Sequence, residues 1–271
     1  AHVGRLGSED EIAEEKGDII EGIAPGGALV LPADSRFVSR LAARARGAGL
    51  EVLTHGEAPG ADARLVAYDG SDDGGRAEIL LRGERIGVTL AAPGRHVALN
   101  ACAVLATVAA LGLSPRVAAS ALPAFGAPAG RGRRTRIAVA GGEALLIDDS
   151  YNASPPSIRA GLAVLGAQAA GRRIAAVGDM RELGDDGPAI HASLAPDAAA
   201  TCDLVFCCGE LMGYLYRALP DAKRGAHCVD SAALAPVLKA ALRPGDAVLV
   251  KGSLGSRMAV VVAALTEGAR A

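Results

Sequence analysis

The chain of 271 residues carries 28 Lys and Arg against 30 Asp and Glu, which gives a formal net charge of −2. This balance excludes the overall positive charge on which nucleic-acid-binding proteins rely. Hydrophobic residues make up 51% and aromatic residues 3% of the chain. We therefore expect a sizeable core of small side chains, divided between two domains of roughly 100 to 200 residues each.

The N-terminal part of the chain has an irregular pattern. Residues 28–31 and 51–54 predict strands on either side of a helix over residues 37–46. The next β-rich runs are broken by Asp-Gly and Gly-Glu turns and predict a meander of strands over residues 64–67, 78–81 and 86–90. A helix that contains Asn100 follows them.

From residue 144 onward, apolar strand patterns alternate with helical patterns. Strands are predicted over residues 144–148, 173–177, 204–208, 226–229 and 247–250. Helices are predicted over residues 156–169, after Pro188, and over residues 211–219, 232–241 and 256–265. This alternation is typical of an α/β fold with a mainly parallel, Rossmann-like sheet. Because residues 127–132 have linker composition, we expect two domains, residues 1–129 and residues 130–271.

Polar residues follow several of the predicted strands. Asp148-Asp149, Gly178-Asp179, Gly209 and Lys251-Gly252-Ser253 all stand at strand carboxyl ends. Ligands of parallel sheets bind at this edge. The sequence therefore predicts a binding site there.

Residues 97–113 form the longest nearly uncharged stretch, but they include Asn100 and Thr107 and fall short of the ~20 apolar residues that a bilayer requires. We expect a buried helix there and no membrane span. The start of the chain has no signal-peptide pattern. The five cysteines form no CxxC pair and predict buried free thiols in a cytoplasmic protein.

Several motifs, in order along the chain, match one pattern. They are residues 94–101 (GRHVALNA), 148–153 (DDSYNA), 178–184 (GDMRELG) with His191 after them, and 251–258 (KGSLGSRM). The opening His2, Gly7-Ser8 and Lys16-Gly17 fit the same pattern. Together these motifs make the chain resemble the Mur ligase family, and within it the members that add D-alanyl-D-alanine to the peptidoglycan precursor.

Mur ligases have a domain for the UDP-sugar, a central ATPase domain and a C-terminal domain for the incoming amino acid or dipeptide. The resemblance implies that residues 1–129 are part of the central ATP-binding domain and that residues 130–271 are the C-terminal domain. It also implies a monomeric ligase that uses ATP and Mg²⁺ to join D-Ala-D-Ala to UDP-N-acetylmuramoyl-tripeptide through an acyl phosphate.

The phosphate-binding GxxGKT/S loop of the family does not occur in the 271 residues. In the family this loop lies upstream of the position that His2 matches. We therefore expect a fragment of a ligase that is inactive by itself.

On the ATP side, the resemblance assigns His2 and Lys16 to Mg²⁺, with Lys16 carbamylated. It assigns Asn100 to adenine, Arg134 to the ATP phosphates during catalysis, and Asp149 to the ribose. The residues themselves leave alternatives open. Lys16 can be a solvated helix residue, Asn100 can cap a helix, and Arg131 or Arg133 can replace Arg134, in a run that can also be a solvated basic linker.

On the dipeptide side, the resemblance assigns Asn152, Asp179, His191, Lys251 and Ser253 to the substrates. An ordinary loop charge at Asp179 and an ordinary helix histidine at His191 are the alternatives. Three positions depart from the family pattern. Gly4 replaces a glutamate beside the expected metal site, and Pro32 and Ser154 each replace an asparagine.

Two other functions remain open. One is a related ligase for a different amino acid, such as another Mur ligase or a folylpolyglutamate synthase. The other is a non-catalytic binding module that has kept the fold. The sequence argues against a nicotinamide dehydrogenase, because no predicted strand is followed by GxGxxG.

Overall fold

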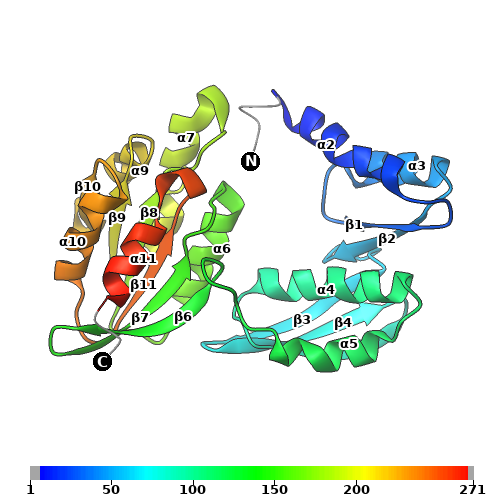
Figure 1. The fold of residues 1–271 in the computed structure, drawn as a ribbon, viewed down its shortest axis with the longest axis horizontal. Helices are drawn as coiled ribbons and strands as arrows, with labels where there is room; N and C mark the ends of the chain where they lie inside the picture. Colours follow the sequence, from blue (N-terminus) through cyan, green and yellow to red (C-terminus); the bar gives the residue numbers. More distant parts are fainter. Residues whose placement is uncertain (1–6, 268–271) are drawn as a thin grey trace. The chain divides into compact units, whose positions relative to one another are not determined.

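The computed structural model describes residues 7–267. These residues divide into two compact units, one over Ser8–Gly126 and one that begins at Ala127 (Figure 1). The division falls three residues before the expected boundary at residues 129 and 130, at the start of the predicted linker. Each unit has its own sheet and its own hydrophobic core.

The sheet of the Ser8–Gly126 unit has the order β1-β2-β3-β4-β5. Its strands are β1 (Ala28–Pro32), β2 (Glu51–Gly56), β3 (Ala63–Ser71), β4 (Gly74–Leu81) and β5 (Glu84–Leu90). The first three are parallel, whereas β3, β4 and β5 form an antiparallel meander. The strand–helix–strand unit and the meander predicted from the sequence are both confirmed.

Helices cover both faces of this sheet. On one face lies α4 (Arg95–Ala110), with α5 (Pro115–Ala121) after it; on the other lies α3 (Val38–Gly47), beside α2 (Glu9–Gly17) and the short η1 (Asp18–Gly22). The buried residues of α4 recur every three or four positions, as expected for a helix with one face on a sheet: Ala98, Ala101, Cys102, Leu105 and Ala106. Within the described residues, no helix is long and apolar enough to cross a membrane.

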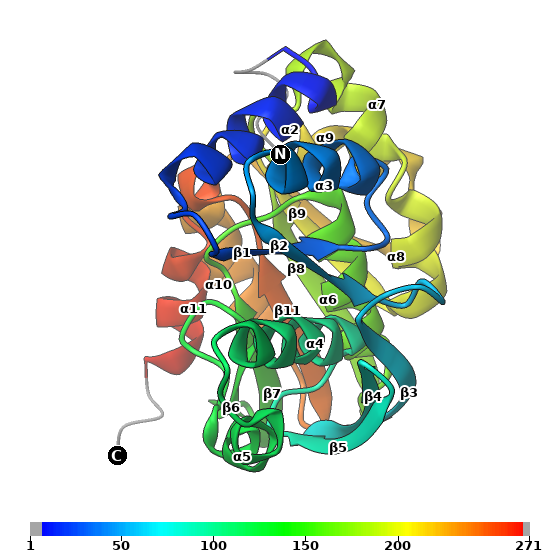
Figure 2. The same ribbon diagram turned by 90° about the vertical axis from the view of Figure 1, so that its right-hand side faces the viewer.

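The second unit contains a six-stranded sheet of order β10-β9-β8-β11-β7-β6. Its strands are β6 (Arg133–Val139), β7 (Gly142–Asp149), β8 (Arg172–Gly178), β9 (Leu204–Cys208), β10 (Arg224–Cys228) and β11 (Asp246–Lys251). All neighbours are parallel except β6 and β7, which form an antiparallel hairpin at one edge. Figure 2 shows β11 between β7 and β8. The predicted α/β class with a mainly parallel sheet is confirmed.

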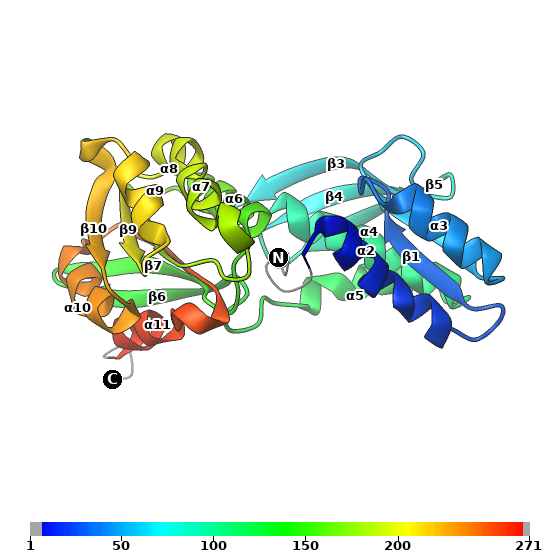
Figure 3. The same cartoon turned by 90° about the horizontal axis from the view of Figure 1, so that it is seen from above.

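The helices of this unit lie on both faces of the sheet (Figure 3). One face packs against α6 (Pro155–Gly166), α7 (Gly187–Ala192), α8 (Ala195–Thr201) and α9 (Met212–Ala218). The other face packs against α10 (Ser231–Ala241) and α11 (Ala259–Thr266). Alternate residues of the central strands enter the two cores, which is why those strands are apolar at nearly every position.

Two local expectations need correction. The basic run around Arg134 is not a linker, because it forms the edge strand β6. The helix expected after Pro188 consists of two short helices, α7 and α8, and α8 has Pro196 in its first turn.

Candidate functional site

The candidate site is the carboxyl edge of the six-stranded sheet, where β7, β11, β8 and β9 end. Strand register places Lys251 opposite Asp149 on one side and opposite Val177 on the other, and Gly178 opposite Cys208. The helix that follows β11 lies on one face, whereas those that follow β7 and β8 lie on the other. The connection that follows β11 therefore leaves on the opposite face of the sheet from those that follow its neighbours β7 and β8. In open α/β sheets, the crevice formed at such a switch point is where ligands bind.

An ion pair joins the ends of β7 and β11. The Lys251 Nζ lies 2.6 Å from the Asp149 Oδ2, and the Lys251 side chain is only 3% exposed. The same ammonium donates to the backbone oxygen of Asn152 at 2.9 Å. Gly161 of α6 lies against this pair, since a Cβ there would be 3.5 Å from the Lys251 Cδ. Lys251 therefore ties the loop after β7 to the sheet.

Asp148 has a different role from its neighbour. It is buried, and its carboxylate accepts hydrogen bonds from the Gly130 N–H at 2.8 Å and from the Ser150 Oγ at 2.6 Å. Gly130 has a φ of +74°, and a Cβ there would lie 3.1 Å from the Tyr151 Cβ. Asp148 therefore fixes the turn around Gly130 and leaves Asp149 as the carboxylate that faces Lys251.

A second set of bonds joins the ends of β8 and β11. The Ser253 Oγ donates to the Asp179 backbone oxygen at 2.5 Å, and the Asp179 carboxylate accepts from the Met212 N–H at 2.7 Å. Gly209 has a φ of +96° and no room for a Cβ, which would lie 2.4 Å from the Asp179 Oδ2. Asp179 thus holds the start of α9 and the turn after β11 in place.

The two loops of this rim pack closely on each other. A Cβ at Gly252 would lie 2.4 Å from the Ser256 Oγ and 3.2 Å from the Gly178 Cα, so the loop needs glycine there. Arg181 donates to the Gly255 backbone oxygen at 3.2 Å, a contact that the sequence did not suggest. Glu182 and Arg257 adopt positive φ angles of 64° and 54°, a conformation that costs non-glycine residues energy and is common at functional sites.

His191 lies inside the fold and does not face the rim. It is 0% exposed, its Nε2 accepts from the Met180 N–H at 3.0 Å, and its Nδ1 donates to the Gly187 backbone oxygen at 2.7 Å. Burial lowers the pKa of this imidazole below its ordinary value. The direct substrate contact expected of His191 does not fit this geometry, because both ring nitrogens hold backbone groups in place.

The three candidate arginines lie in different surroundings. The Arg134 Nη2 donates to the Gln168 Oε1 at 2.5 Å, which directs it to the residues just after α6. Arg133 pairs in register with Asp148. The Arg131 guanidinium lies 4.3 Å from the centre of the Tyr151 ring, a cation–π contact beside the loop after β7. Arg131 and Arg133 thus both lie beside the DDSYNA motif, Arg131 through its side chain on Tyr151 and Arg133 through strand pairing with Asp148.

The candidate ATP-side residues of the Ser8–Gly126 unit are exposed. Lys16 ends α2, and its Nζ lies 2.8 Å from the Glu15 carboxylate. Asn100 is the sixth residue of α4 and is exposed. It therefore does not cap the helix, and its exposed amide is accessible to a ligand. His2 lies outside the described residues.

The described residues contain no group of three or more His, Cys, Asp or Glu side chains that could hold a metal ion. Mg²⁺ commonly binds to one or two carboxylates plus the phosphates of a nucleotide. This part of the chain therefore does not form a protein-only metal cage. The five cysteines are free thiols, and burial raises the pKa of Cys102, Cys202 and Cys208 to about 12, which leaves them unreactive.

The doubly covered, mainly parallel sheet defines an α/β domain, and its polar carboxyl edge is where ligands of such sheets usually bind. The family model of the Mur ligase middle domain matches residues 1–108, and that of the Mur ligase glutamate ligase domain matches residues 132–254. The chain belongs to the Mur ligase family, whose members are ATP-dependent carbon–nitrogen ligases.

Named relatives support the same family. The chain is 32% identical to UDP-N-acetylmuramate–L-alanine ligase of Streptomyces avermitilis over 93% of its length and 56% of the relative's. It is 31% identical to UDP-N-acetylmuramoyl-tripeptide–D-alanyl-D-alanine ligase of Escherichia coli over 98% of its length and 58% of the relative's. The chain thus spans little more than half of these relatives.

A solved structure gives the same result for the fold. The crystal structure of MurF from Acinetobacter baumannii superposes with a TM-score of 0.85 at 27% sequence identity. The superposition covers 98% of this chain and 57% of that chain.

Proposed function

We propose that this chain is the part of an ATP-dependent ligase that receives D-alanyl-D-alanine and joins it to UDP-N-acetylmuramoyl-tripeptide. The observation that carries the proposal is the rim built from Asp149, Asn152, Asp179, Lys251 and Ser253 at one edge of the six-stranded sheet. These residues come from the DDSYNA, GDMRELG and KGSLGSRM motifs, and strand register brings all three motifs to one edge.

The reaction has two steps. ATP phosphorylates the carboxylate of the tripeptide and leaves as ADP; the amine of the dipeptide then attacks the acyl carbon, forms the amide bond and releases phosphate. Such chemistry depends on alignment and on neutralising charge more than on covalent help from the protein. The rim supplies alignment. Lys251 and Asp149 fix the loop that presents Asn152, whose exposed amide can donate to the carboxylate of the dipeptide.

ATP and Mg²⁺ belong to the proposal as cofactors of the complete ligase. Bound Mg²⁺ would neutralise phosphate charge, with His2 and the carbamylated side chain of Lys16 as proposed ligands. Asn100, Asp149 and Arg134 are the proposed ATP contacts. Arg131 is an equally suitable phosphate ligand, since a guanidinium binds phosphate well and its contact with Tyr151 holds it beside the rim. We place residues 1–129 in the partial ATP-binding domain and residues 130–271 in the dipeptide domain of a cytoplasmic, monomeric enzyme.

One observation favours a second candidate, a ligase for a single amino acid. A relative that is 32% identical is named UDP-N-acetylmuramate–L-alanine ligase. The amine in that name is a single amino acid, whereas the first candidate receives a dipeptide at the rim. The two candidates share the fold and the use of ATP. They differ only in the amine that enters the rim.

Binding of the amine tests the proposal. NMR spectra of the full chain are recorded with millimolar D-Ala-D-Ala, D-Ala or L-Ala, and amide shifts near Asn152 and Ser253 are followed. We expect saturable shifts at the rim with D-Ala-D-Ala and a loss of affinity of about tenfold in Asn152→Ala, equivalent to one lost hydrogen bond of ~1.4 kcal/mol. Arg159→Gln, which removes an exposed ion pair with Asp197 in the same unit, is the control.

The outcomes separate the candidates. Rim shifts that appear with L-Ala and not with the dipeptide would replace the first candidate by the second. Shifts with none of the three amines would refute both and leave a module with another ligand.

A further inference from the structure

Helix α2 is attached to its unit almost without apolar contacts. Its sequence, EDEIAEEKG, is mostly charged, and its buried residues are only Ala13 and Gly17. Amphipathic helices usually attach to a domain through an apolar stripe. α2 lacks such a stripe, so other interactions must hold it.

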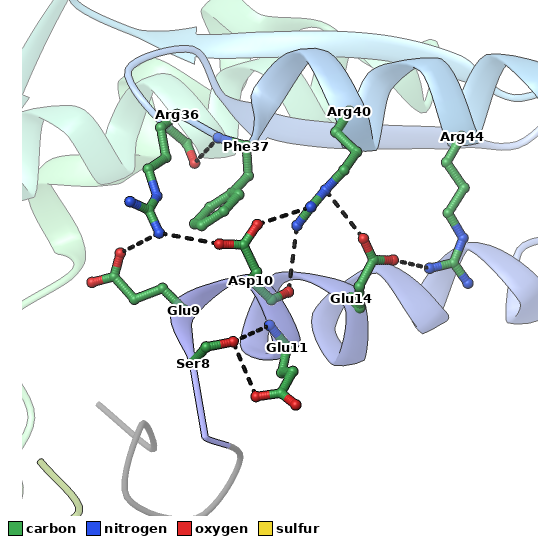
Figure 4. Close-up of polar contacts among 10 residues, drawn as sticks. Ser8, Glu9, Asp10, Glu11, Glu14, Arg36, Phe37, Arg40 and Arg44 are labelled. Atoms are coloured by element: carbon green, nitrogen blue, oxygen red, sulfur yellow. Dashed lines mark hydrogen bonds and ion pairs between the residues drawn. The ribbon is translucent and has the colours of Figure 1, made fainter. Parts of the chain in front are cut away.

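Those interactions are ion pairs with α3 (Figure 4). Arg40 bonds to the Asp10 carboxylate at 3.0 Å and to the Glu14 carboxylate at 3.1 Å. Arg36 reaches Glu9 and Asp10 at 3.0 and 3.5 Å. The next arginine of the row, Arg44, contacts Glu14 at 3.5 Å and continues past the end of α2 to Asp18 and Glu21 at 2.8 and 3.0 Å.

The spacing of these residues explains the array. Asp10, Glu14 and Asp18 are four residues apart, as are Arg36, Arg40 and Arg44. Residues four apart lie on the same face of a helix. Arg40 and Arg44 lie in α3 and Arg36 two residues before it, and Asp18 directly follows α2, so the two outer residues extend the rows just past the helix ends. One acidic row therefore faces one basic row, and each arginine bridges two or more acids. Phe37 lies under Arg36 and Arg40, with its ring centre 4.5 and 5.2 Å from their guanidinium carbons, and limits their freedom.

The C-terminal end of α2 is held differently. There η1 begins, and Ile20 is buried with Ala45 and Leu50 in a small apolar cluster. A Cβ at Gly17 would lie 2.9 Å from both the Arg44 Nη1 and the Leu41 Cδ2, so side chains of α3 pack closely on α2 at this point. The C-terminal end of α2 is thus held by apolar packing as well as by the Arg44 ion pairs, whereas the rest of α2 is held mainly by charge.

The array is exposed to solvent. Its acidic side chains are 52% to 76% exposed and its arginines 30% to 62%. Exposed pairs contribute little one by one and are weakened by salt. Attachment of α2 should therefore respond to ionic strength, unlike attachment through an apolar face, which salt leaves unchanged or strengthens.

We infer that Arg36, Arg40 and Arg44 form an electrostatic latch that closes α2 onto α3, with the apolar cluster at Ile20 as its hinge. Because α2 carries Lys16, the latch positions that lysine. This last role rests on the proposed function of Lys16, whereas the latch itself does not.

Hydrogen exchange of the full chain, followed by mass spectrometry, tests the latch. NaCl is raised from about 0.02 to about 0.5 M at constant pH. We expect the amides of residues 12–17 to exchange about tenfold faster in high salt, because screening weakens all pairs of the array together. The amides of α4, which packs through an apolar face, serve as the internal control and should not change. Exchange of α2 that is unchanged or slower in high salt would overturn the latch.

Charge reversal separates the latch from a general loss of stability. Changing Arg36, Arg40 and Arg44 together to glutamate should open α2 at low salt. Adding Asp10→Lys, Glu14→Lys and Asp18→Lys should restore its protection, since the rows are then opposite again. A reversed chain whose α2 stays unprotected, while α4 is native-like, would contradict the inference.

A separate variant distinguishes the latch from the function of Lys16. Lys16→Met should leave the exchange of α2 and its salt response unchanged, because Lys16 contacts Glu15 and no residue of the latch. Loss of the salt response in Lys16→Met would count against the latch as described. A normal salt response in a chain that binds no amine at the rim would keep the latch and refute the proposed function.

Discussion

The two units differ in whether any of their described charged pairs is buried, although both units also carry exposed pairs such as Arg159–Asp197 of the second unit. In the Ser8–Gly126 unit, the side chains of every described pair are at least 30% exposed, as in Arg82–Glu51 at 49% and 48%. In the other unit, Asp246 is 1% exposed beside Arg172, and Lys251 is 3% exposed beside Asp149. Exposed pairs hold surface elements such as α2 against their neighbours, each with a small free energy. Buried pairs fix the two ends of a sheet, and removal of one partner there leaves a charge without compensation.

The largest effect is expected at the amino edge of the six-stranded sheet. Arg172→Met removes both bonds that Arg172 makes to the Asp246 carboxylate, at 2.7 and 2.9 Å. We expect a loss of about 4 kcal/mol in the free energy of unfolding, measured by urea denaturation. Arg159→Met, at an exposed pair of the same unit, should cost less than about 1 kcal/mol. Equal losses in the two variants would break the comparison.

A smaller loss is expected at the carboxyl edge, because Asp149 is 24% exposed and water can partly replace its partner. Lys251→Met should lower the free energy of unfolding by about 2 to 3 kcal/mol. It should also weaken amine binding, since the backbone of Asn152 loses its tether. Combining it with Asp149→Asn should recover part of the stability, because the carboxylate that has lost the Lys251 ammonium is then replaced by a neutral amide. A double variant no more stable than Lys251→Met would contradict this account.

Buried His191 extends the comparison to pH. Its folded-state pKa is lowered, so the unfolded chain takes up a proton as pH falls through about 6.5, whereas the folded chain does not. The stabilisation due to neutral His191 is therefore complete above that pH and is lost below it, by up to ~1.4 kcal/mol per pH unit. The difference in unfolding free energy between the wild-type chain and His191→Gln, measured from pH 8 to about 5, isolates this histidine. If this difference in unfolding free energy did not change with pH, burial would not lower the pKa of His191 as expected.

The smallest effect is expected for an exposed pair outside the latch. Arg82→Gln removes the ion pair with Glu51 and should change the free energy of unfolding by about 0.5 kcal/mol or less. The change should vanish in about 1 M NaCl, where charges are screened within a few ångströms. A loss that persists in high salt would mean that Arg82 contributes through packing of its side-chain stem.

The sequence predicts the sheet of the second unit well, because its central strands are short runs such as LVFCC and DAVLVK, buried at almost every position. It fails at β6. There Arg133, Arg134 and Arg136 obscure a pattern in which Ile137 is the one buried position. An edge strand of this kind is held by hydrogen bonds to its hairpin partner β7. The pattern of apolar and polar residues along β6 alone does not reveal that pairing.

The candidate site was predictable as a location and less so in its detail. Strand ends marked Asp149, Asp179 and Lys251, since the polar residues directly follow apolar runs. The spacing did not reveal that Lys251 is neutralised by Asp149 or that His191 turns inward. Both depend on which elements are neighbours in three dimensions, and the order β8-β11-β7 is not sequential.

The turn at Gly130 connects the short segment between the two units to the loop after β7. The Gly130 N–H is bonded to Asp148, its carbonyl accepts from the Tyr151 N–H at 3.0 Å, and Arg131 rests on the Tyr151 ring. Only Ala127, Pro128 and Ala129 separate this anchored point from Gly126, where the first unit ends. The connector between the two units is therefore short, and it ends at a turn that is hydrogen-bonded to the loop presenting Asn152.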